Sequence, residues 1–99
     1  MSDINDVITT DDLLVYLGID YADDTVISNI FRAINTADGE LREAVRDDYP
    51  VDHPLTKELA LIYAARSYEQ RDLSANEEKR ADQLALKLRL VLRRRSNNE

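Results

Sequence analysis

The sequence has 99 residues, of which 43% are hydrophobic and 33% charged, and 13 basic residues face 20 acidic ones for a net charge of -7. This length suits a single domain, and a content of only two glycines and two prolines favours a small all-α domain over a β-sandwich. The absence of cysteine excludes disulfides, thiolate zinc sites and a cysteine nucleophile.

The first helix is predicted between residues 9 and 17. Thr9 can cap its N-terminus, and Asp12 stands at the third helical position, close to the positive end of the helix dipole. Gly18 then ends the helix, because glycine readily adopts the left-handed conformation that a helix stop requires. In that arrangement Ile19 packs back onto the helix.

A long second helix is predicted from about Asp24 to Arg46, with Asp23 or Asp24 as its cap. The next residues, 47–53, predict a loop, because Pro50 holds the residue before it out of helical geometry. The apolar residues of the helix recur at steps of three and four and form one stripe. This stripe contains Val26, Ile27, Ile30, Phe31, Ile34, Ala37, Leu41, Ala44 and Val45.

A third helix is predicted from Pro54, which suits a first helical position, to about Gln70. A helix that is apolar on nearly every side is buried against several neighbours, so we expect this helix at the centre of the fold. Arg66 lies on its apolar side and would need a carboxylate partner. The two apolar sides are formed by Leu55, Leu59, Ile62 and Tyr63, and by Leu61, Ala64, Ala65 and Tyr68.

Ser74 and Glu77 have the spacing of a capping box and predict the start of a fourth helix, which reaches about Arg93. Leucines alternate in this segment as they would in a strand. The capping box and the content of alanine, lysine, arginine and leucine nevertheless favour a helix. Its core stripe would contain Ala81, Leu84, Ala85, Leu88, Val91 and Leu92.

In a helix, Leu86 and Leu90 project from the face opposite this stripe. A monomer would leave both leucines in water beside Arg89 and Arg93, which favours an intermolecular contact. The alternative is that the two leucines cover loops of their own domain. Together the four segments predict an all-α fold, a small bundle of about four helices with a buried third helix and an extended basic C-terminal helix.

The charge is distributed unevenly along the chain. Residues 79–99 carry a net charge of +5, and residues 1–78 carry -12. Such a dipolar chain favours head-to-tail self-association or docking of the basic end on an acidic partner. The alternative for Arg93, Arg94 and Arg95 is a solvated charged tail.

The sequence offers no set of residues for catalysis. His53 is the one histidine, in a loop, where a helix cap or a surface position is commoner than an Asp-His pair. Paired aspartates stand where helix starts and loops prefer acids, and there is no glycine-rich phosphate loop or calcium loop. We therefore expect no enzyme activity, no cofactor and no metal.

The aromatic residues are dispersed and mostly at core spacing, so most of them are expected in the core. Tyr21 and Tyr49 stand in acidic connections and are the two candidates for surface anchors. The N-terminus lacks the basic and apolar blocks of a signal peptide, and the longest apolar run, residues 59–65, is far shorter than the roughly 20 residues of a membrane span. We expect a soluble protein without membrane contact.

Three segments in succession resemble the head-tail connector proteins of tailed bacteriophages. The most telling are the opening Leu-x-x-Tyr-Leu-x-Ile-Asp of residues 13–20 and the closing Tyr-Glu-x-Arg of residues 68–71, with an amphipathic helix after Asp23 between them. The resemblance covers about residues 8–73. It divides one connector domain into an N-terminal arm (1–7), a family-like core (8–73), a C-terminal helix (74–95) and a tail (96–99).

The resemblance implies a virion protein of the head-tail neck, made in the cytoplasm of a bacterial host. Such a protein forms a ring under the portal, twelvefold to match it, which completes the DNA-filled head and gives a docking platform to a tail-side stopper or tail-completion protein. It has no enzymatic activity or cofactor, and non-specific contact with DNA in the channel is a further candidate interaction. By position, the residues that would meet the portal or a neighbouring subunit are Leu86, Lys87, Arg89, Leu90, Arg93, Arg94 and Arg95.

The alternative hypothesis is a small nucleic-acid-binding regulator that grips phosphates with its basic C-terminal segment. It is the weaker of the two hypotheses, because a helix that recognises DNA bases should expose arginine, lysine, asparagine or glutamine. The predicted second helix exposes mixed charge, and the third is apolar all round.

Overall fold

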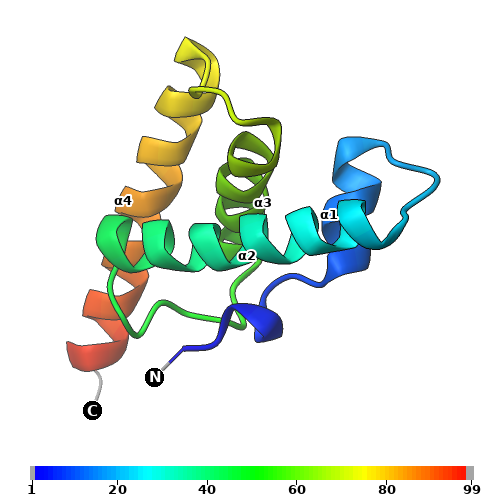
Figure 1. Cartoon of the computed structure of the whole chain (residues 1–99). Helices are drawn as coiled ribbons and strands as arrows, with labels where there is room; N and C mark the ends of the chain where they lie inside the picture. The colour runs from blue at the N-terminus through cyan, green and yellow to red at the C-terminus, as the bar shows by residue number, and fades with distance from the viewer. Residues whose placement is uncertain (1, 98–99) are drawn as a thin grey trace.

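The computed structural model describes residues 2–97, which form four α-helices, one short 3₁₀-helix and no strand (Figure 1). The all-α prediction is confirmed. The elements are η1 (Ile4–Asp6), α1 (Thr10–Leu17), α2 (Asp24–Ala44), α3 (Pro54–Glu69) and α4 (Ala75–Asn97). None of the described helices is both long and apolar enough to cross a membrane.

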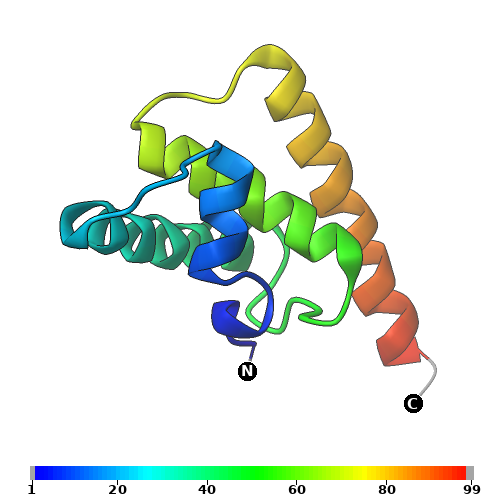
Figure 2. The ribbon, with the colours of Figure 1, turned by 90° about the vertical axis from the view of Figure 1, so that its right-hand side faces the viewer.

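Helix α3 lies at the centre of the fold, as its sequence predicts. In two views at right angles, α2 and α4 lie on different sides of α3, and α1 crosses it on a third side (Figures 1 and 2). Leu59, Ala60 and Ala64 of α3 are fully buried. A helix with apolar residues all round can be covered only by several neighbours, and these three helices provide that cover.

Helix α1 begins and ends as predicted. The hydroxyl of Thr9 accepts a hydrogen bond from the Asp12 amide (3.1 Å), and the Asp12 carboxylate accepts one from the Thr9 amide (2.9 Å), which completes a capping box. Gly18 adopts the left-handed conformation (φ 73°), and the Ile19 amide donates to the Leu14 carbonyl over 3.0 Å. This stop turns the chain towards α2.

The ends of α2 and α4 differ from the predicted ones by a few residues. Helix α2 ends at Ala44 instead of Arg46, because Val45 leaves the helical region (ψ -85°) and its side chain turns into the core. Helix α4 runs to Asn97 instead of Arg93. Arginines favour helix, and an ion pair from Arg95 to the loop before α3 holds the last turns in place.

The N-terminal arm contains a helical turn that the sequence analysis does not predict. Asp3 caps η1 by accepting a hydrogen bond from the Asn5 amide (2.9 Å), and Ile4 and Val7 are buried against the main core. Only two apolar residues carry this contact, which is too few to produce a readable period. Residue 1 and residues 98–99, the end of the predicted tail, lie outside the described residues.

Candidate functional site

The candidate site is the outward face of α4. One side of this helix is buried against the body, and it carries Ala81, Leu84, Ala85, Leu88 and Leu92, all members of the predicted core stripe. On the opposite side Leu86 is 53% exposed and Leu90 is 41% exposed. Helix α4 packs mainly against α3, and no other described element covers its outward side. The two leucines therefore do not cover loops of their own domain.

A network at the α3–α4 connection fixes where α4 begins. Ser74 and Glu77 form the predicted capping box, with hydrogen bonds of 3.0 and 3.2 Å between side chains and backbone amides. Arg71 grips the same Glu77 carboxylate through both terminal nitrogens, at 2.7 and 3.0 Å. The Arg71 guanidinium and the Ser74 amide lower the pKa of Glu77 to about 2. This charged clamp sets the direction in which α4 leaves the body.

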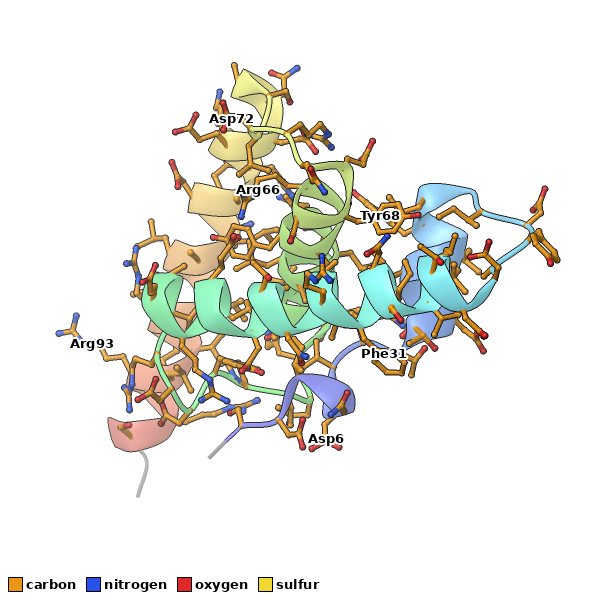
Figure 3. The ribbon with its side chains drawn as sticks, viewed as in Figure 1. Asp6, Phe31, Arg66, Tyr68, Asp72 and Arg93 are labelled. Carbon is orange, nitrogen blue, oxygen red and sulfur yellow. The ribbon has the colours of Figure 1, made fainter. Side chains whose placement is uncertain are left out.

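Four cations stand around the two exposed leucines: Lys87, Arg89, Arg93 and Arg94. All four are exposed, and none forms an ion pair within the part of the chain that the structure describes. Figure 3 shows Arg93 extending away from the body. Together with Leu86 and Leu90 they form what is called here the α4 face, which is apolar in the middle and cationic around it.

Arg95, which the sequence analysis groups with these residues, has a partner inside the chain. Its guanidinium lies 3.1 Å from an Asp52 carboxylate oxygen, in the loop before α3. The guanidinium, by its hydrogen bond and its charge, lowers the pKa of Asp52. Arg80, near the start of α4, likewise forms an ion pair with Glu58 of α3, with 2.8 Å between the guanidinium nitrogen and the carboxylate oxygen. These two arginines hold α4 to the body, whereas the four cations of the α4 face form no ion pair with the described residues.

The two predicted aromatic anchors behave differently. Tyr21 is 81% exposed in the connection between α1 and α2, as predicted. The prediction for Tyr49 is wrong, because its side chain is buried. Its hydroxyl donates to the Asp38 carboxylate over 2.7 Å, and the Arg42 guanidinium lies 5.5 Å from the ring centroid. Burial and the bond to Asp38 raise the pKa of Tyr49 well above its usual range. The hydrogen bond to Asp38 of α2, eleven positions earlier in the sequence, stabilises the buried position of this loop residue.

The expectation that the other aromatics are mostly core is too broad. Phe31 is 54% exposed and lies on the opposite side of α2 from Tyr68 (Figure 3). It stands about 100° around the helix from the buried Ile30, and the buried face of α2 turns the other way, towards Ala33. Tyr16 is also half-exposed, and its neighbour Val15 is 81% exposed. Spacing alone could not decide which edge of each stripe reaches the core.

Two polar residues that the sequence analysis singles out, His53 and Arg66, have structural roles. The imidazole Nδ1 of His53 accepts a hydrogen bond from the Leu55 amide (3.1 Å) and caps α3, which is one of the expected uses of this histidine. Arg66 finds its expected carboxylate partner in Glu40 of α2. Among the described residues no group of three or more histidine, aspartate and glutamate side chains is placed to hold a metal ion.

An open groove of about 550 Å³ lies where α2, α3 and the start of α4 meet. Arg66 and Asp72, both labelled in Figure 3, line it together with Glu40, Glu78 and Asp82. The Arg66–Glu40 ion pair already neutralises its one cation. Within residues 2–97 the one buried side-chain polar atom without a partner, Thr56 Oγ1, is not among the lining residues. The groove is open and lined mainly by charged side chains, whereas a small-molecule site is typically lined mainly by apolar ones.

No model of a known protein family matches the chain, and neither the curated proteins nor the solved structures compared with it give a significant match. The interpretation of the site therefore depends on its residues.

Proposed function

We propose that this chain is a structural head-tail connector of a tailed bacteriophage. In this proposal it forms a ring under the portal, completes the DNA-filled head and presents a docking platform to a tail-side protein. It works without catalysis or cofactor.

The observation that carries the proposal is the α4 face. Two leucines at helical spacing stand in water, and the four cations around them form no ion pair with any of the residues that the structure describes. Isolated exposed leucines are ordinary, but a pair at the centre of a cationic helix face is typical of a surface that is completed by another protein. An adaptor needs such a surface, whereas an enzyme needs a pocket.

The residues that resemble the connector family also bear on the proposal. The opening motif of residues 13–20 forms the second half of α1 and its left-handed stop, and the closing motif of residues 68–71 ends α3 next to the Arg71–Glu77 clamp. Both motifs thus stand at turns that fix how three helices pack and how α4 leaves them. Because the motifs fix these turns, proteins that share them are expected to share the same helix arrangement.

The proposal is tested by sedimentation velocity of the purified chain, alone and mixed with the purified portal ring of the virus that encodes it. We expect self-association, or assembly once the portal is present. A chain that sediments as a monomer in both conditions contradicts the proposal.

A double variant connects this test to the α4 face. Replacement of Leu86 and Leu90 by serine should leave the helical circular dichroism signal unchanged and weaken assembly or portal binding. Asn35→Ser together with Thr36→Ser, both exposed on α2, is the control and should assemble like the wild type. Loss of helicity in the leucine variant would assign both leucines to the core of the monomer.

The free cations also suit the second candidate, binding of nucleic acid through phosphates. Its test is titration of duplex DNA at several salt concentrations. Micromolar binding that weakens steeply with salt, without any association with the portal, would favour this candidate over the connector.

A further inference from the structure

A second exposed apolar patch lies at the α1 end of the molecule. Val15 and Tyr21 are both 81% exposed, and Tyr16 is half-exposed. Four exposed carboxylates accompany them, Asp11, Asp20, Asp23 and Asp24. These seven residues are called here the acidic end.

The charges of the two patches are opposite and are kept apart in the sequence. Residues 1–31 contain seven acidic residues and no basic one. Residues 79–97 contain seven basic residues and a single acidic one, Asp82. Each patch therefore has exposed apolar side chains among charges that are mostly of one sign, although Lys57 pairs with Asp12 of α1 and Asp82 is exposed on α4. This is the arrangement of a protein interface with complementary electrostatics.

The two patches cannot meet within one molecule. Helix α1 and helix α4 lie on different sides of α3 in both views, and the α4 face is turned away from α3 (Figures 1 and 2). A partner for either patch must therefore come from another molecule, and the chain itself presents a surface of suitable chemistry for each.

We propose that the α4 face of one copy of this chain docks on the acidic end of a second copy. Leu86 and Leu90 then cover Val15 and Tyr21 of the neighbour, and the α4 cations face its aspartates. The contact joins two different surfaces, so a pair of copies keeps one acidic end free on the first copy and one α4 face free on the second, and assembly continues to a closed ring or a filament. This inference builds on the proposed function by naming the faces that join neighbouring subunits.

The absence of cysteine from the chain allows a direct test by disulfide cross-linking. Val15→Cys in one tagged copy is mixed with Leu90→Cys in another and oxidised. We expect the mixed disulfide to exceed both symmetric dimers several-fold. Glu43→Cys, exposed at the other end of α2, replaces Val15→Cys in the control and should give little mixed product. Predominance of the Leu90→Cys symmetric dimer, or a yield equal to the control, overturns the inference.

Charge reversal gives a second test that needs no new bond. Variant D20K/D24K and variant R93E/R94E should each fail to self-associate, because each brings like charges together at the contact. Mixed, they should restore the sedimentation coefficient of the wild type, since both kinds of contact regain opposite charges. Thermal unfolding of each variant checks that it is folded. The exposed pair D6K/E43K carries the same change in net charge as D20K/D24K and should associate like the wild type. Failure of the mixture to associate, with both variants folded, contradicts the inference.

These outcomes separate the inference from the proposed function. Cross-linking and charge rescue without any binding to the portal would support the head-to-tail contact and reject the connector. Portal binding by a chain whose copies join through other residues would reject the contact and keep the connector.

Discussion

Helices α3 and α4 are built from similar apolar residues but use them differently. Helix α3 has neighbours on several sides, and most of its leucine and alanine side chains are buried in the core. Helix α4 packs mainly on α3, and it buries one stripe and leaves two leucines in water. The difference indicates that the body is completed by α3, whereas α4 keeps a surface for other molecules.

The largest effect is expected from Leu59→Ala in α3. This side chain is fully buried, so its truncation leaves a cavity and should lower the free energy of unfolding by about 2–5 kcal/mol. Chemical denaturation measures the change. Leu86→Ala in α4 is the matched control, with an expected change within about 0.5 kcal/mol. Equal losses in the two variants would erase the contrast between the helices.

Tyr49→Phe should have the next largest effect. It removes the hydroxyl that donates to Asp38 over 2.7 Å and leaves the ring in place. The loss of a hydrogen bond to a charged group should lower the free energy of unfolding by about 1.5–3 kcal/mol. Tyr21→Phe, at the exposed aromatic, should change nothing measurable. An unaffected Tyr49→Phe variant would mean that ring burial alone holds the loop between α2 and α3.

A smaller, pH-dependent effect is expected at the joint between α3 and α4. The pKa of Glu77 is about 2 in the folded chain against an ordinary 4.5, so its ionised form stabilises the fold above pH 4.5. That contribution is lost as the pH falls from 4.5 towards 2. The difference in unfolding free energy between the wild type and Glu77→Gln should therefore be largest above pH 4.5 and shrink in acid.

Urea denaturation across this pH range measures the Glu77 effect. Glu78→Gln, exposed on the same turn of α4, is the control and should show a smaller difference from the wild type. A Glu77→Gln difference that does not vary with pH would show that the clamp from Arg71 adds nothing to the stability of the joint.

The smallest effect on the fold is expected from replacing Arg93, Arg94 and Arg95 with glutamine. Exposed ion pairs contribute little to stability, so the loss of the Arg95–Asp52 pair should leave the free energy of unfolding nearly unchanged. Portal affinity should fall most at low salt, because charges are screened over about 8–10 Å at physiological ionic strength. Arg32→Gln, exposed on α2, is the control. Unchanged affinity at every salt concentration would make these arginines a solvated tail.

Local signals in the sequence were enough to predict much of the fold. Thr9, Gly18 and Ser74 mark helix ends through short-range chemistry, and the structure has those ends. The exposure of Leu86 and Leu90 also follows from helical spacing alone. These features depend on residues at most four or five positions apart, which a sequence displays directly.

Features set by distant contacts could not be predicted in this way. Tyr49 is buried because Asp38 and Arg42 of α2 receive it, and Phe31 is exposed because α2 turns another edge inward. Similarly, Arg95 does not belong to the α4 face, because its guanidinium pairs with Asp52, 43 positions away in the sequence. Each outcome depends on how separate segments of the chain pack against each other, and the period of a single helix does not contain that information.

The central claim is that the α4 face is covered by another protein molecule when this chain does its work. Hydroxyl-radical footprinting of the chain, dilute and assembled, reports the solvent access of individual side chains. The account predicts that Leu86 and Leu90 are oxidised in the dilute chain and protected several-fold in the assembly, while Phe31 is oxidised equally in both. Equal oxidation of the two leucines in both states would contradict it.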